Sequence, residues 1–246
     1  MINKRALATA VAASTLAVTG LAQAEVKVGF LGGFTGGIES LTPPIFEGAQ
    51  LAVEQINEQG GLLGGQTLVM PTGDTTCSDA SAASNAADRM VNSENVTAIL
   101  GALCTGATIA AANNAAIPGG VLMVSPASTA PAVSELDDND LVFRTVPSDA
   151  FQGEILAKLL LEKGIDAVAV TYVNNDYGQG LSDAFSAAFE AGGGEITENL
   201  AHEDNRADYR SELGALSVSG VDTLVVLAYA DTSGQTSTTS VCLTST

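Results

Sequence analysis

The sequence predicts an α/β protein with parallel sheets, arranged as two successive lobes behind an export leader. Short apolar, β-branched runs alternate with segments whose apolar residues recur at helical spacing, an order that is typical of parallel sheets. This alternation is interrupted near residues 144–150, where an extended segment meets Pro147 and a new helical pattern starts. We therefore expect a first lobe at residues 25–145 and a second at 146–231.

The leader is expected at residues 1–24. Lys4 and Arg5 precede an apolar stretch at 6–21, and Ala22-Gln23-Ala24 has the small-x-small pattern of a cleavage site. A transmembrane anchor is the alternative, but the apolar stretch is short and rich in Ala and Thr. The pattern predicts an exported protein that is cleaved after Ala24.

The periodicity places each element of the two lobes. In the first lobe it predicts strands at 26–31, 66–71, 97–101 and 121–124, an extended segment at 141–146, and helices at 43–59, 78–91 and 109–116. In the second lobe it predicts strands at 167–173, 195–200 and 221–227, and helices at 151–163, 181–189 and 209–216.

The end of the chain has a different character. Residues 232–246 carry no charge, show no periodicity and are dominated by Ser and Thr, although a helix is expected after the strand at 221–227. We expect a disordered, aberrant tail, as in a truncated or frameshifted chain.

Two loops rich in Ser and Thr follow neighbouring strands, at residues 100–108 and 125–131, and neither contains Lys or Arg. A strand-end loop that leads into a helix presents unpaired backbone N–H groups, which suit a carboxylate or a phosphate. We expect the two loops to form one crevice that offers neutral donors to a small anionic group. For each threonine taken alone, the alternative is a helix N-cap.

One of the three cysteines, Cys104, lies in the loop at 100–108. Cys77 and Cys104 each follow an apolar strand and lie 27 residues apart. In an oxidising compartment a disulfide between them would tie the loop after the strand at 66–71 to the loop at 100–108, and two free buried thiols are the alternative. Cys242 lies in the tail and has no obvious partner.

Several classes of function fit the sequence poorly. The formal net charge of −19 argues against nucleic acid, because phosphate backbones are bound by clustered Lys and Arg. His202 is the single histidine and stands in a polar stretch that we predict to be a surface loop. There is no Gly-x-Ser-x-Gly elbow and no His/Cys cluster, so we expect no enzyme, cofactor or metal site.

Five stretches spread over residues 25–231 carry a family resemblance. They are Val26 to Gly29, Glu47 to Asn57 with Gly60-Gly61, Asp74 with Cys77 and Leu103-Cys104-Thr105, Val124 to Thr129, and Asn175 to Gly180. Together they resemble the periplasmic substrate-binding proteins of the leucine/isoleucine/valine class of ABC transporters.

The resemblance implies a type I periplasmic-binding-protein-like fold, in which two Rossmann-like lobes close on a ligand, with the second lobe incomplete here. It implies a disulfide between Cys77 and Cys104. Thr105 would bind the ligand's α-carboxylate through its hydroxyl and N–H.

The resemblance also implies that the carbonyl of Ala127 receives the ammonium and that Thr129 offers its hydroxyl and N–H. Tyr177 and Tyr229 would cover the ligand from the second lobe, and half-buried packing is the alternative for both. Family members are longer and supply an acid for the ammonium from beyond residues 221–227, so Asp231 is a candidate substitute.

The expected function is capture of a branched-chain or related amino acid in the periplasm. A monomer would deliver it to an inner-membrane ABC permease. The alternatives are a non-functional truncated fragment, a binder of amides or short-chain carboxylates, an α/β enzyme, and the ligand-sensing domain of a receptor.

Overall fold

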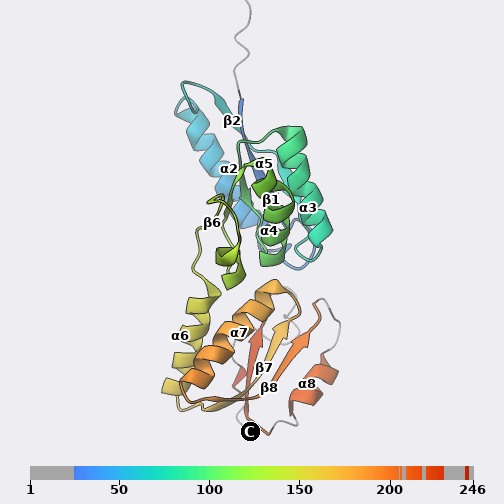
Figure 1. Ribbon diagram of the computed structural model, residues 1–246, viewed down its shortest axis with the longest axis vertical. Coiled ribbons are helices and arrows are strands. Elements are labelled where there is room, and N and C mark those ends of the chain that lie inside the picture. The colour runs from blue at the N-terminus through green and yellow to red at the C-terminus, as the bar shows by residue number, and fades with distance from the viewer. Residues whose placement is uncertain (1–24, 205, 207–208, 218–219, 230–241, 244–246) are drawn as a thin grey trace, which may run out of the picture.

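The computed structural model of the protein describes residues 25–204, 206, 209–217, 220–229 and 242–243. It has two lobes, each built around its own mainly parallel sheet, and the chain passes from one to the other just before helix α6 (Figure 1). The leader expected at 1–24, Asp231 and all of the tail at 232–246 except Cys242–Leu243 lie outside the described residues.

The sheet of the first lobe has the strand order β2-β1-β4-β5-β6, with β3 also paired to β1, and all of these pairs are parallel. The prediction of a single strand at 66–71 is wrong. Two short strands lie on either side of Pro71, because proline has no N–H to donate to a strand ladder. The strands are β1 (Glu25–Gly32), β2 (Thr67–Val69), β3 (Thr72–Asp74), β4 (Ala98–Gly101), β5 (Leu122–Ser125) and β6 (Val142–Arg144).

The helices of the first lobe begin and end at residues suited to those positions. Pro43 and Pro44 open α2, and its Asn57 exchanges two hydrogen bonds of 2.8 Å with the backbone of Leu68. The Asp79 carboxylate caps the first turn of α3. The helices are α2 (Thr42–Glu58), α3 (Ala80–Asp88), η1 (Arg89–Glu94), α4 (Thr105–Ala111), η2 (Ala112–Ala116), α5 (Ile117–Gly119) and the 3₁₀ turn η3 (Pro131–Glu135).

The core of the first lobe lies between its sheet and the helices α3 and α4. Buried alanines on both helices let them pack closely, while larger side chains from the strands fill the centre. Fully buried members of this core include Phe30, Leu31, Met90, Ile99 and Met123.

The second lobe has the strand order β10-β9-β7-β8, in which β9-β7 and β7-β8 are parallel and β10-β9 is antiparallel. Helices α6 and α7 lie side by side against the sheet, and Phe185 and Phe189 of α7 fill the space between (Figure 1). The elements are α6 (Asp149–Glu162), β7 (Ala167–Val173), α7 (Asp176–Ala191), β8 (Glu195–His202), α8 (Arg210–Ser217), β9 (Thr223–Leu227) and β10 (Cys242–Leu243).

Two helices begin earlier in the chain than their apolar spacing predicts. Helix α4 starts at Thr105 rather than at 109, and α7 starts at Asp176 rather than at 181. The side chain of Asn175 accepts a hydrogen bond of 3.0 Å from the N–H of Gly178, which caps α7 at its true start. Both early turns are polar, so hydrophobic periodicity does not detect them.

The prediction that His202 lies in a surface loop is wrong. His202 is the last residue of β8, it is only 8% exposed, and its Nδ1 lies 2.8 Å from the hydroxyl oxygen of Thr171. Its ring meets that of Tyr209 edge-on. The β7-β8 pairing extends as far as His202, which explains why this polar residue is buried.

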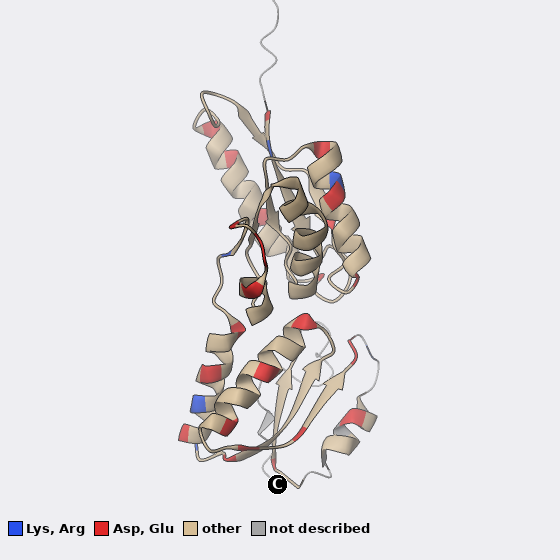
Figure 2. Ribbon diagram, viewed as in Figure 1, with Lys and Arg blue, Asp and Glu red and all other residues tan. Residues whose placement is uncertain are grey.

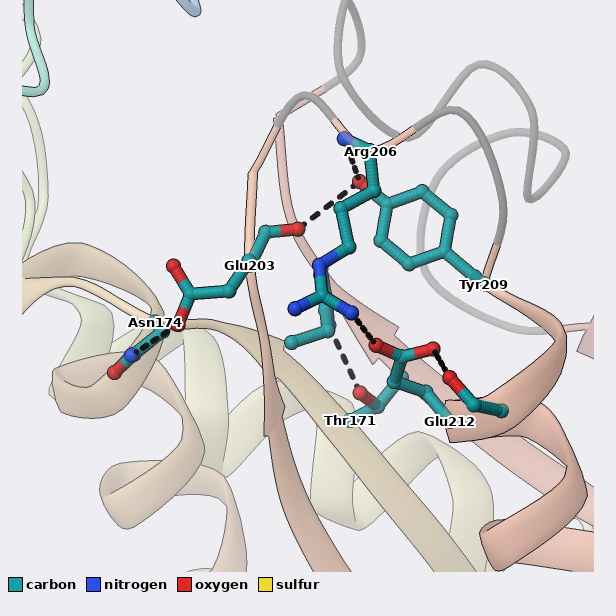
Figure 3. A network of polar contacts seen from close by, with 8 residues as sticks. Thr171, Asn174, Glu203, Arg206, Tyr209 and Glu212 are labelled. Carbon is teal, nitrogen blue, oxygen red and sulfur yellow. Dashed lines mark hydrogen bonds and ion pairs between the residues drawn. The ribbon is translucent and has the colours of Figure 1, made fainter.

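Polar contacts beyond β8 hold the following loop to the end of β7 (Figure 3). Asn174 donates to the carboxylate of Glu203 at 2.7 Å, and Arg206 pairs with Glu212 of α8 at 2.7 Å. Both contacts lie within the second lobe.

Acidic residues occur along the ribbon of both lobes and clearly outnumber the basic ones (Figure 2). No helix in the described part of the chain is both long and apolar enough to cross a bilayer.

Candidate functional site

A cavity of about 210 Å³ lies where the two lobes meet. All five residues proposed as ligand contacts line it, and none of its lining residues carries a charge. The first lobe contributes an apolar side and two threonines, and the second contributes Gln152 and two tyrosines. The lining residues are Ile38, Leu41, Ile45, Leu103, Cys104, Thr105, Ala127, Thr129, Gln152, Tyr177 and Tyr229.

The two loops rich in Ser and Thr meet at this cavity, but several of their hydroxyls bind the protein itself. The carbonyl oxygen of Ala102 accepts from the hydroxyls of Thr108 at 3.1 Å and Ser125 at 2.6 Å. The hydroxyl oxygen of Ser128 lies 2.7 Å from the hydroxyl oxygen of Thr108, and both residues are buried. These three side chains hold the loops together, whereas Thr105 and Thr129 line the cavity.

Thr105 is the first residue of α4 and is 1% exposed. Its hydroxyl oxygen accepts a long hydrogen bond of 3.4 Å from the N–H of Ala130, so it links the two loops. The hydroxyl proton remains available to an acceptor in the cavity, because this bond uses only an oxygen lone pair.

Thr129 is held through its backbone. Its carbonyl oxygen accepts from the Arg144 guanidinium at 2.9 Å and from the N–H of Asp149 at 2.8 Å. The same guanidinium donates to the carbonyl of Ala130 and to the hydroxyl of Ser134. Arg144 therefore fixes the loop at the point where the chain leaves the first lobe.

The expected disulfide between Cys77 and Cys104 is confirmed, with the two Cα atoms 5.4 Å apart. It ties the loop after β3 to the residue before α4. Nearby, burial alone would raise the pKa of Asp74, but hydrogen bonds from Thr35, Thr76 and Phe34 hold it below its ordinary value. Both features draw the strand-end loops to one edge of the sheet.

Tyr177 and Tyr229 form the side of the cavity that comes from the second lobe. Their rings stack with centroids 5.0 Å apart and planes 19° apart, and Tyr229 also packs on the core of the first lobe. Burial, with a smaller contribution from the Asp149 charge, raises the pKa of Tyr177 to about 12. Burial likewise raises the pKa of Tyr229, so both phenols stay neutral donors at physiological pH.

The lobes are in close contact beside the cavity. A Cβ atom added to Gly106 of α4 would lie 2.5 Å from a carboxylate oxygen of Asp176 in α7. A Cβ added to Gly180 would lie 3.0 Å from Cβ of Ala130. The absence of side chains at these two glycines allows the lobes to approach this closely.

The sequence patterns do not identify two residues, Gln152 and Asp149, as neighbours of the cavity. Gln152 lines it from the first turns of α6, and Asp149, the first residue of that helix, is fully buried next to Thr129. In the sequence, Asp149 follows the N-cap Ser148 and looks like an ordinary acid in a first helical turn, favoured there by the helix dipole.

The chemistry of the cavity lining is neutral and in part apolar. It offers hydroxyl and amide donors and an apolar wall, and the described residues contain no group of side chains that could hold a metal ion. Such a cavity can hold a small solute that carries a carboxylate and an apolar side chain.

Comparison with known proteins gives a consistent result. Residues 25–238 match the family described as periplasmic binding protein. The Leu/Ile/Val-binding protein BraC3 of Rhizobium johnstonii is 35% identical over 191 residues, which are 77% of this chain and 50% of that protein. The chain spans about half the length of the curated relatives it matches.

Solved structures agree with the fold. The leucine-binding protein LivK from Thermotoga maritima has a TM-score of 0.74 and 30% identity, covering 82% of this chain and 55% of that one. The branched-chain amino acid transporter substrate-binding protein LivJ from Streptococcus pneumoniae, in complex with isoleucine, has a TM-score of 0.71 and 28% identity. That match covers 82% of this chain and 56% of LivJ.

Proposed function

Because this chain belongs to the periplasmic binding protein family, we propose that it captures a branched-chain or related amino acid between its two lobes for uptake by an ABC transporter. The single observation that carries the proposal is the uncharged cavity into which Thr105, Ala127, Thr129, Tyr177 and Tyr229 converge. The names of similar proteins, Leu/Ile/Val-binding protein and leucine-binding protein, favour this solute class.

Each lining group has a part in the proposal. The hydroxyls and N–H groups of Thr105 and Thr129 receive the α-carboxylate, since neutral donors to a charged acceptor make strong hydrogen bonds. The carbonyl of Ala127 receives the ammonium. The apolar side chain of the solute lies against the wall formed by Ile38, Leu41, Ile45 and Leu103.

Release and capture require the lobes to separate and close. The connection between Arg144 and Asp149 is the hinge in this proposal, because it joins the last strand of the first sheet to the first helix of the second lobe. Tyr177 and Tyr229 then cover the solute from the second lobe, and the contact between Gly106 and Asp176 marks the closed arrangement.

The proposal places the chain in the periplasm as a monomer, with a leader at residues 1–24 that is cleaved after Ala24. Its partner is an inner-membrane ABC permease, which receives the solute when the lobes open. No catalytic step is involved.

The test is thermal melting of the purified protein with leucine, isoleucine, valine, a panel of amides and short-chain carboxylates. A solute that binds only the folded state raises the melting temperature with its concentration. We expect the branched-chain amino acids to do so. In the variants Thr105→Ala and Thr129→Ala the affinity falls by about ten- to hundredfold, since each loses a hydrogen bond to a charged group.

Thr72→Ala is the matched control, because Thr72 is exposed on β3 and does not line the cavity. It should leave the ligand-induced shift unchanged. A response to amides or short-chain carboxylates alone would replace the solute class. A response to no solute would contradict the proposal.

A further inference from the structure

Asp149 is a buried carboxylate without a partner. It is 0% exposed, and neither of its carboxylate oxygens has a hydrogen-bond partner among the described residues. A charge that is buried without a partner is costly, so such groups are rare outside functional sites. Burial raises the pKa of Asp149, and the Thr129 hydroxyl and the Arg144 charge, which act on the carboxylate from nearby without a hydrogen bond of normal geometry or an ion pair, offset only part of that rise.

The nearest basic group is committed elsewhere. Arg144 donates to the carbonyls of Thr129 and Ala130 and to the hydroxyl of Ser134, and no salt bridge joins it to Asp149 among the described residues. The guanidinium therefore shapes the loop and does not neutralise the carboxylate through contact.

Asp149 lies immediately behind the cavity. Its N–H donates to the carbonyl of Thr129 at 2.8 Å, and Gln152 lines the cavity one helical turn further along α6. Its negative charge also raises the pKa of both Tyr177 and Tyr229. The charge of Asp149 therefore acts on both tyrosines of a cavity whose own lining is uncharged.

We infer that Asp149 supplies the negative charge that selects a solute with an ammonium group, and so makes the site specific for amino acids over simple carboxylic acids. This inference rests on the proposed function. Neutral donors suffice for the α-carboxylate, but an ammonium that leaves water needs a nearby anion. When the solute binds, the buried charge of Asp149 gains the counterion that it lacks.

The test uses three probes on the purified protein, measured by calorimetry and by melting. They are leucine, 4-methylpentanoate, which is leucine without the ammonium, and 3-methylbutylamine, which is leucine without the carboxylate. Wild-type protein should bind leucine at least about thirtyfold more tightly than 4-methylpentanoate.

The variant Asp149→Asn should reduce the affinity for leucine by about thirtyfold or more and leave 4-methylpentanoate within about threefold of wild type. Without solute it should melt no lower than wild type, because the change removes an unpaired buried charge. Asp183→Asn is the matched control: Asp183 is exposed on α7 and should leave the affinities of all three probes unchanged.

The outcomes separate the two claims. If wild type binds leucine and Asp149→Asn binds it equally well, the role of Asp149 is refuted and the proposed function stands. If wild type binds 4-methylpentanoate as tightly as leucine, ammonium selection is refuted even without the variant. If wild type binds none of the three probes, the proposed function itself fails.

Discussion

The phenol rings of Tyr177 and Tyr229 stack on one another with centroids 5.0 Å apart, although 52 positions of sequence separate them. Tyr177 packs on the core of the second lobe, and Tyr229 packs on the core of the first. The pair therefore joins both lobes at the cavity, and its burial leaves the phenols neutral.

The first prediction concerns alkaline stability. The pKa of Tyr177 is raised from 10.0 to about 12, so the folded state retains a proton that the unfolded chain loses. The stabilisation is complete below pH 10 and is lost as the pH rises from 10 to 12. The melting temperature of Tyr177→Phe should fall less than that of wild type over this range. Equal falls would contradict the burial of the phenol.

The second prediction concerns the disulfide. It closes a loop with a sequence separation of 27 residues, for which chain-entropy estimates give about 3–4 kcal/mol of stability. We expect the double variant Cys77→Ala/Cys104→Ala to lose about this much in denaturant unfolding. Because Cys104 lines the cavity, leucine affinity should fall as well. Reductant should destabilise the wild-type protein by a similar amount and leave the double variant unchanged, and equal stability of the wild type with and without reductant would contradict a role for the disulfide.

The third prediction concerns the approach of the lobes. Gly106→Ala places a Cβ 2.5 Å from a carboxylate oxygen of Asp176, so this exposed side chain or the lobe that carries it must move, and solute binding should weaken by about two- to fivefold. The double variant Gly106→Ala/Asp176→Ala removes the obstacle and should recover most of the affinity. Calorimetric titration with leucine measures both.

Gly48→Ala is the control for this pair, because Gly48 lies within α2 and a Cβ there would meet nothing within 4 Å. It gains helix propensity without touching the other lobe. If the double variant binds no better than Gly106→Ala, contact between the lobes is not what limits binding.

The fourth prediction concerns His202. Burial lowers its pKa below 6.5, although Asp204, Glu212 and Glu203 oppose this, so the folded state binds fewer protons than the unfolded chain. Stability should therefore decrease as the pH falls through 6.5. His202→Asn keeps a polar group near Thr171 without this titration, and its melting temperature should depend less on pH between 7.5 and 5.5. As the single histidine, His202 can also be followed directly by NMR.

Sequence patterns predict most of the fold because its elements are set by local chemistry. Short apolar runs rich in β-branched residues, such as 167–173, favour buried strands, and Pro43-Pro44 and Gly60-Gly61 mark where α2 starts and stops. The disulfide and the convergence of the five cavity residues follow from a family resemblance that spans both lobes. Their ligand roles remain predictions.

Other features depend on contacts between distant residues, which no local pattern records. His202 is buried because β8 pairs with β7 as far as His202 itself, and the Thr171 hydroxyl meets its ring there. The hydroxyls of Ser125 and Thr108 donate to the carbonyl oxygen of Ala102, so neither donates into the cavity. Asp149 looks like an ordinary acid at a helix start, and only the folded structure shows that it is buried without a hydrogen-bond partner among the described residues.

The most direct test of solute capture is equilibrium dialysis of the purified chain against labelled leucine. We expect saturable binding of one leucine per chain, displaced by isoleucine and valine and weakened in Thr129→Ala. Absence of saturable binding by a chain that melts cooperatively would contradict capture of a branched-chain amino acid at this cavity.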